Sequence, residues 1–320
     1  MATFSRLCVL LAPVLLLIAS SEASVLPRVG FLFNNNSDYH EDVRALGKRL
    51  FTYNPGSTDP QDASGSNRPT RKELNAYLPA VFNGQEPYYG FPLPTVSTIA
   101  RDGVSDERAV SQQQQFGKTP FQIISSRMHG CTTIVVTSNR GVWMTHLWES
   151  YSNGKDENGE HLTNAGDPAF NQRVLMFLRG QTVTNPLPNG YADYIAPSGP
   201  RIDATLFNNG RSDQTEVFIF TPVKQGIAAT EINNPDTLKF EERYGVKGEV
   251  SKAIADILGR RPTVTKVPYI RLDTNNAAEA AQLGTNARGT VLFQYDPNSN
   301  GSGKKAWRLF VEDRFNYKSI

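Results

Sequence analysis

Two neighbouring β-prone runs constrain the fold of this chain more than any other feature of its sequence. Residues 131–137 (CTTIVVT) and 142–148 (VWMTHLW) are rich in β-branched and aromatic side chains. Residues 138–141 (SNRG), which lie between them, are typical of a turn, so the two runs predict a β-hairpin. A turn centred on Asn139 and Arg140 pairs residues whose numbers sum to 279.

This register puts Cys131 and His146 on the same face of the hairpin. Cys131 lies opposite Trp148, and His146 is one diagonal step away, within reach of a longer side chain. A slip of one residue would turn His146 to the opposite face. The hairpin therefore predicts a thiol beside an imidazole.

A thiol beside an imidazole is the minimum for nucleophilic catalysis by cysteine. The thiolate attacks, and a neighbouring histidine lowers the pKa of a thiol from its usual value of about 8.5. The imidazole takes up the thiol proton and later gives a proton to a leaving amine. The backbone N–H groups of Gly130 and Cys131 are candidates for holding an oxyanion. The alternative is a buried, inert cysteine and a histidine that packs in the core.

The N-terminal sequence predicts that Cys131 is the one thiol of the mature chain. Residues 1–23 combine a short basic start, an apolar run over residues 7–20 and a small residue at Ala23, which is typical of a secretory signal peptide. Cleavage after Ala23 leaves 297 of the 320 residues and removes Cys8. A secreted protein with one cysteine has no internal disulfide framework, so packing must stabilise its core. Its thiol is either buried and inert or kept for its reactivity.

Charge and residue spacing argue against several kinds of partner. A net charge of +2 argues against nucleic acid, and no later apolar run reaches the roughly 18 residues of a membrane span. His146 and Glu149 have the spacing of a metal site on a helix, but the segment has the pattern of a strand, so we expect no metal and no cofactor. Asn35 and Asn300 begin glycosylation sequons in loop-like segments.

The order of the predicted elements favours an α/β fold. Strands and helices alternate from residue 120 onwards, which predicts a mixed β-sheet core with helices packed on it and the Cys131/His146 hairpin at its centre. We expect a main domain over residues 110–320, with an irregular segment, residues 24–109, packed on it. The predicted strands are residues 121–124, 131–137, 142–148, 217–221, 263–271, 291–295 and 307–311, and the predicted helices are 168–179, 246–258 and 277–283.

Three smaller features also predict local structure. Thr70 and Glu73 form a capping box that opens a short helix through Tyr77. The polar tract at residues 112–115 is expected to be solvated, and residues 150–166 are expected to form a surface loop.

The stretch from His129 to His146 resembles the active-site hairpin of the catalytic domains of cytotoxic necrotizing factors and dermonecrotic toxins. Those domains are glutamine deamidases, and some are also transglutaminases. The shared pattern is Gly-Cys-Thr at the entrance to a strand, a turn, and a histidine on the return strand. The bacterial chemoreceptor glutamine deamidases have a related Cys-then-His layout. The whole chain is also similar to uncharacterised secreted fungal proteins that carry this hairpin and a late LFQYDP segment, here residues 292–297.

The resemblance implies that Cys131 is a nucleophile and that His146 is its general base and acid. The toxins complete the site with a main-chain carbonyl from elsewhere in the chain, and His129 here replaces their small residue before Gly-Cys. The predicted function is that of a secreted cysteine-dependent amidohydrolase or transamidase acting on the side-chain carboxamides of a glutamine-bearing protein or peptide. Two alternatives stay open: a non-catalytic secreted effector or binding protein that keeps the fold, and a cysteine peptidase.

Overall fold

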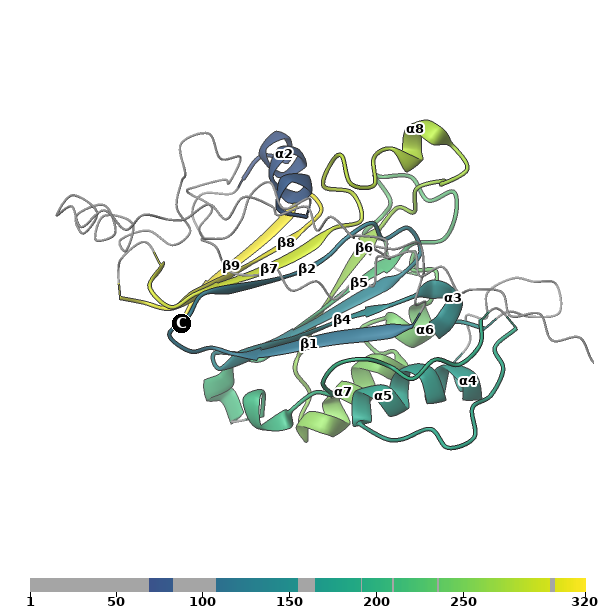
Figure 1. The fold of residues 1–320 in the computed structure, drawn as a ribbon, viewed down its shortest axis with the longest axis horizontal. Coiled ribbons are helices and arrows are strands. Elements are labelled where there is room, and N and C mark those ends of the chain that lie inside the picture. Colours follow the sequence, from purple (N-terminus) through teal and green to yellow (C-terminus); the bar gives the residue numbers. More distant parts are fainter. Residues whose placement is uncertain are drawn as a thin grey trace, which may run out of the picture. The chain divides into compact units, whose positions relative to one another are not determined.

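The strands of the protein form two sheets that pack face to face, with helices on their outer faces (Figure 1). The structure is a computed structural model, and all residues that it describes belong to one compact unit, Asp42–Ile320. The predicted signal peptide, most of the segment 24–109, and the sequon residues Asn35 and Asn300 lie outside the described residues. The described residues are 69–82, 108–154, 165–190, 192–208, 210–234, 236–299 and 303–320.

The five-stranded sheet contains the predicted hairpin at its centre. Its strand order is β1-β4-β3-β5-β6, and only β5 and β6 run parallel, so the sheet is mixed. Every residue of β3 and β4 is buried, because both faces of the sheet are covered. The strands are β1 (Ala109–Gln115), β3 (Thr132–Thr137), β4 (Gly141–Leu147), β5 (Glu216–Pro222) and β6 (Thr263–Tyr269).

The four-stranded sheet is antiparallel throughout, in the order β2-β7-β8-β9. Its central pair is the late hairpin that the sequence predicts, whereas its last strand is not predicted. The mixed α/β class is confirmed, with the strands divided between two sheets where the sequence predicts one. The strands are β2 (Phe121–Ser125), β7 (Val291–Asp296), β8 (Ala306–Val311) and β9 (Arg314–Ser319).

Alternation of side chains along the strands separates the buried residues into three clusters. One cluster fills the space between the two sheets and includes Val135, Met144 and Phe293. A second lies between the other face of the five-stranded sheet and the helices, and a third lies between the four-stranded sheet and α2 (Figure 1). The helices are α2 (Arg71–Phe82), α3 (Glu149–Ser152), α4 (Pro168–Phe170), α5 (Met176–Arg179), α6 (Glu241–Tyr244), α7 (Glu249–Leu258) and α8 (Ala277–Ala280), with a π-helical segment at Asn171–Leu175 and 3-10 turns at Ala204–Leu206 and Gly210–Asp213.

The helix boundaries follow the capping signals of the sequence. Thr70 and Glu73 form the predicted capping box, with the Glu73 amide donating to Thr70 Oγ1 at 3.3 Å and the Thr70 amide donating to Glu73 Oε2 at 2.6 Å. The helix that they open continues to Phe82, beyond the predicted end at Tyr77. Leu78 and Val81 are fully buried against the four-stranded sheet, and this packing extends the helix through Pro79.

Of the two predictions based on polar composition, the solvated tract is confirmed at Gln114 and Gln115, which are exposed, and the surface loop is contradicted at its start. Residues 112–115 are the second half of β1, because their backbone pairs with β4 at the edge of the sheet, where polar side chains reach solvent. The start of the expected surface loop is buried instead. Tyr151 and Asn153 are at most 1% exposed, the Tyr151 hydroxyl donates to Ile195 O at 2.7 Å, and Arg243 donates to Asn153 Oδ1 at 2.7 Å.

Candidate active site

The central hairpin has the register that the sequence predicts. β3 and β4 pair Thr133 with His146 and Val135 with Met144, and both pairs sum to 279. Cys131 immediately precedes β3, two residues before Thr133, so its side chain lies on the same face as His146. That face is directed toward the four-stranded sheet, and Cys131 belongs to the cluster between the sheets. The predicted parity of Cys131 and His146 is therefore confirmed.

Cys131 is held in place by a hydrogen bond to its backbone carbonyl. Its side chain is in the reduced form and the residue is 5% exposed. The Tyr269 hydroxyl, at the end of β6, donates a hydrogen bond to Cys131 O at 2.8 Å. Burial raises the pKa of Tyr269 well above its ordinary value, with the neighbouring Cys131 and Glu149 acting in the same direction. Tyr269 therefore stays protonated and keeps this donor.

His146 bridges the two sheets. It lies on β4 and is 2% exposed, and its Nδ1 lies 2.8 Å from Ser125 Oγ at the end of β2, in the other sheet. The hydroxyl of Thr133 has two possible acceptors for its one proton, Ser125 Oγ at 3.2 Å and Met128 Sδ at 2.9 Å. Sequence analysis did not single out Ser125, because its role depends on how β2 packs against β4.

The hydrogen bonds around Ser125 favour one tautomer of His146. The Ser125 hydroxyl can donate to Met128 Sδ, 3.7 Å away, which leaves a lone pair for His146 Nδ1–H. His146 Nε2 has no hydrogen-bond partner in the described part of the chain. With the proton on Nδ1, Nε2 is an unpaired acceptor, which costs less when buried than an unpaired N–H donor. The imidazole therefore presents a lone pair at Nε2.

The burial of His146 keeps its imidazole neutral. Desolvation, together with a smaller contribution from the nearby His129, lowers the pKa of His146 from 6.5 to about 3. At neutral pH the ring is therefore an uncharged imidazole. Trp148 is half-buried beside it, with the two ring centroids 5.4 Å apart.

No hydrogen bond joins the two predicted catalytic side chains. His146 Nδ1 is engaged by Ser125 and His146 Nε2 has no hydrogen-bond partner in the described residues, so the thiol of Cys131 does not hydrogen bond to the ring. Catalytic hydrogen bonds are often long before substrate binds. The structure brings the two residues to one face without forming the direct contact.

An ion-pair cluster around the buried carboxylate of Glu149 lies against the other predicted element of the site, Gly130. A Cβ atom at Gly130 would overlap Glu149 Oε2, so only glycine allows this close approach. Glu149 is at the start of α3, where Lys239 Nζ donates to its Oε1 at 2.8 Å and Arg271 Nη1 lies 3.3 Å from its Oε2. Sequence analysis considered Glu149 only for its spacing from His146.

The oxyanion and metal predictions stay predictions. Nothing in the structure tests whether the amides of Gly130 and Cys131 can donate to an oxyanion. Among the described residues, no three or more His, Cys, Asp or Glu side chains gather as they would around a metal ion. No helix in the described ranges is long and apolar enough to cross a membrane.

Fold and site together define an α/β protein of two packed sheets, with cysteine and histidine on one face of the central hairpin. No protein-family model matches the chain, and no curated protein matches it significantly. The resemblance to the toxin deamidases therefore depends on the hairpin residues alone.

Proposed function

We propose that this protein is a secreted cysteine-dependent amidohydrolase or transamidase that acts on glutamine side chains of a protein or peptide. One observation carries the proposal. His146 is anchored through Nδ1 to Ser125 at 2.8 Å, and its Nε2, which has no partner among the described residues, lies on the same face of the hairpin as Cys131. An anchored neutral imidazole beside a thiol is the arrangement that nucleophilic catalysis by cysteine requires.

The proposed reaction has two halves. The Cys131 thiol passes its proton to His146 Nε2 as the sulfur attacks the carboxamide carbon, forming a C–S bond. The C–N bond then breaks, and ammonia leaves with the proton from Nε2, so a thioester remains on Cys131. Water attacks the thioester and yields glutamate, while a primary amine in its place yields an isopeptide. The proton of the attacking group returns through His146 to the sulfur.

Three groups support this chemistry in the proposal. Ser125 orients the imidazole so that Nε2 rather than Nδ1 receives the proton. Tyr269 fixes the backbone of Cys131. The amides of Gly130 and Cys131 are the proposed donors to the oxyanion that forms when sulfur attacks.

Ammonia release from a glutamine-bearing peptide tests the proposal. The wild-type protein is expected to release ammonia, and Cys131→Ser is expected to abolish it because the nucleophile is lost. His146→Asn should lower the rate by roughly 10²- to 10⁴-fold, the usual contribution of general acid–base catalysis. His129→Asn is the matched control and should keep most of the activity. Equal release by wild type and Cys131→Ser would refute the proposal, and peptide-bond cleavage without ammonia would instead identify a peptidase.

A further inference from the structure

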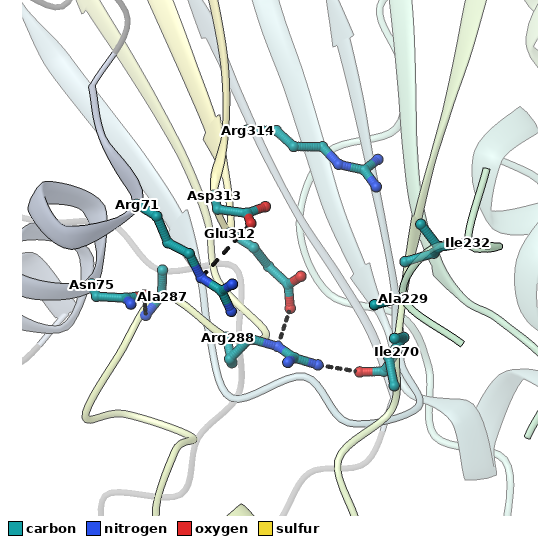
Figure 2. Close-up of a pocket in the computed structure, with 10 residues that line it drawn as sticks. All are labelled: Arg71, Asn75, Ala229, Ile232, Ile270, Ala287, Arg288, Glu312, Asp313 and Arg314. Carbon is teal, nitrogen blue, oxygen red and sulfur yellow. Dashed lines mark hydrogen bonds and ion pairs between the residues drawn. The ribbon is translucent and has the colours of Figure 1, made fainter. Parts of the chain in front are cut away.

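A hollow of about 160 Å³ lies between α2, the β8–β9 turn and the segment that follows β6 (Figure 2). Three arginines from separate elements line it: Arg71 at the start of α2, Arg288 just before β7, and Arg314 at the start of β9. The rest of the wall is Asn75, two acidic residues of the turn, and the short apolar side chains of Ala229, Ile232, Ile270 and Ala287.

Two of the three guanidinium groups have carboxylate partners in the hollow. Arg288 Nε lies 3.2 Å from Glu312 Oε1, and Arg71 Nε lies 3.9 Å from Asp313 Oδ2 (Figure 2). Arg314 has no carboxylate within 4.0 Å in the described part of the chain, and its Nη2 donates only to Pro268 O, at 3.2 Å. The hollow therefore contains one positive charge that no described residue of its lining neutralises.

The carboxylate of Glu312 binds other groups in the wall of the hollow and does not neutralise the charge of Arg314. Its Oε1 accepts from Arg288 and, at 2.9 Å, from the amide of Gly289. The residue has a φ of 50°, which is unfavourable for a side chain other than glycine. The two hydrogen bonds hold it in this turn with its carboxylate facing Arg288, as Figure 2 shows.

A second hollow, of about 320 Å³, continues past Arg314 along the open side of the two sheets. It is lined by β6 and β9, which are edge strands of their sheets, and it shares Asp313 and Arg314 with the first. Lys266 also lies in its wall, with its ammonium group 3.8 Å from Glu241 Oε2. Arg314 therefore lies between two adjoining hollows, where an extended chain could place one side chain in each.

We propose that these hollows form a docking site for an acidic peptide segment, with an Asp or Glu carboxylate bound by Arg314. A cavity of about 160 Å³ is smaller than the pockets that usually bind drug-sized ligands and fits a single side chain. The planar guanidinium binds a carboxylate through two parallel hydrogen bonds. The first hollow has one net positive charge, which one carboxylate would neutralise.

The role of the docking site rests on the proposed function. In that role, the docking site binds an acidic segment of the glutamine-bearing substrate. Arg288 Nη2 donates to Ile270 O at 2.6 Å, and the preceding residue, Tyr269, binds the backbone of Cys131. The Met128 amide donates to Gly289 O at 3.0 Å. The wall of the hollow and the candidate active site are thus parts of one hydrogen-bonded framework.

Fluorescence anisotropy with labelled hexaglutamate tests the docking site without requiring catalysis. The full chain with Cys131→Ser is expected to bind hexaglutamate saturably and labelled hexalysine not at all. Adding Arg314→Gln should weaken binding about tenfold or more, and Arg314→Lys, which keeps the charge but loses the planar fork, should weaken it less. Arg261→Gln is the matched control, because it removes the same charge from an exposed side chain outside both hollows.

The outcomes separate this inference from the proposed function. Absence of hexaglutamate binding, or equal affinities for Arg314→Gln and Arg261→Gln, would overturn the docking site. Inorganic phosphate that competes as well as hexaglutamate would reduce it to a general anion site and overturn the peptide assignment. Ammonia release from a neutral glutamine peptide tests the active site alone. If both proposals hold, an acidic tail on that peptide lowers KM for wild type but not for Arg314→Gln, whose folding is checked by its thermal melting curve.

Discussion

His146 is defined chemically by the two nitrogen atoms of its ring and by their different surroundings. Nδ1 is bound to Ser125 across the space between the sheets, and Nε2 has no partner among the described residues. Desolvation makes the neutral ring the stable form. A neutral ring with one nitrogen anchored can accept a proton at the other.

Ser125 is expected to act as a positioning residue for His146. Ser125→Ala removes the partner of Nδ1, so kcat for ammonia release should fall about tenfold or more, while KM stays unchanged because Ser125 is fully buried and does not contact substrate. Ser125→Thr keeps a hydroxyl and should restore most of kcat. Failure of the threonine variant to recover activity, although it folds, would argue that Ser125 only packs.

The pKa of His146 predicts a pH dependence of stability. Its folded pKa, about 3, is below the ordinary 6.5, so between these values the unfolded chain binds a proton that the folded chain excludes. This contribution to the free energy of unfolding is complete above about pH 6.5 and is lost as pH falls, by up to about 1.4 kcal/mol per pH unit.

Urea unfolding between about pH 4 and pH 7 measures this contribution. His146→Asn should show a shallower decline in stability toward acid than wild type, because the other titrating groups are common to both proteins. His129→Asn removes only the smaller of the two causes that lower the pKa of His146, so it should keep most of the wild-type decline. Parallel curves for wild type and His146→Asn would contradict a buried neutral imidazole.

At the scale of single elements, the sequence predicts a helix or hairpin well where the residues that define it are neighbours along the chain. The turn residues between β3 and β4 set the register of the hairpin, and with it the shared face of Cys131 and His146. Asp167, whose side chain accepts from the Ala169 amide, and Gly180, with a φ of 67°, bound the predicted helix at 168–179.

Elements that depend on distant partners could not be predicted in the same way. The glutamine-rich half of β1 is a strand only because β4 lies beside it. Ser125 meets His146 only because β2 belongs to the opposing sheet, and Glu149 is buried only because Lys239 and Arg271 reach it from other segments. No spacing within the sequence encodes these three contacts.

The capping box of α2 gives a prediction at the same scale. Thr70→Ala removes the side-chain acceptor of the Glu73 amide, so the free energy of unfolding should fall by about 1 kcal/mol. Thr70→Ser keeps the acceptor and should be close to wild type. The midpoints of urea denaturation measure both variants, and an unchanged midpoint in Thr70→Ala would mean that packing of Leu74 and Leu78 alone holds the helix.

At the scale of the whole described unit, the packing of two sheets is what assembles the candidate site. The sequence predicts one mixed sheet, since the pattern of a strand does not reveal which sheet it joins. In the structure, His146 of one sheet contacts Ser125 of the other, and Cys131 belongs to the apolar cluster that the two sheets share. The site therefore depends on the sandwich as a whole, and the hairpin supplies only its two reactive side chains.

The packed sheets also bring their edge strands β6 and β9 to the same side, where Arg314 hydrogen bonds to Pro268. The residues proposed for the docking site come from α2, the segments beside β6 and β7, and the β8–β9 turn, so they are assembled only in the folded chain. If both proposals are correct, one molecule joins substrate recognition and chemistry through the same two-sheet framework.

The most direct test of the central claim is the fate of a glutamine side chain in water labelled with heavy oxygen. Wild-type protein is expected to convert a peptide glutamine to glutamate that carries one heavy oxygen atom, because water resolves a thioester on Cys131. Cys131→Ser should leave the glutamine unchanged in the same mass-spectrometric assay. Unlabelled, unconverted peptide after incubation with folded wild-type protein, or equal conversion by the serine variant, would contradict the account.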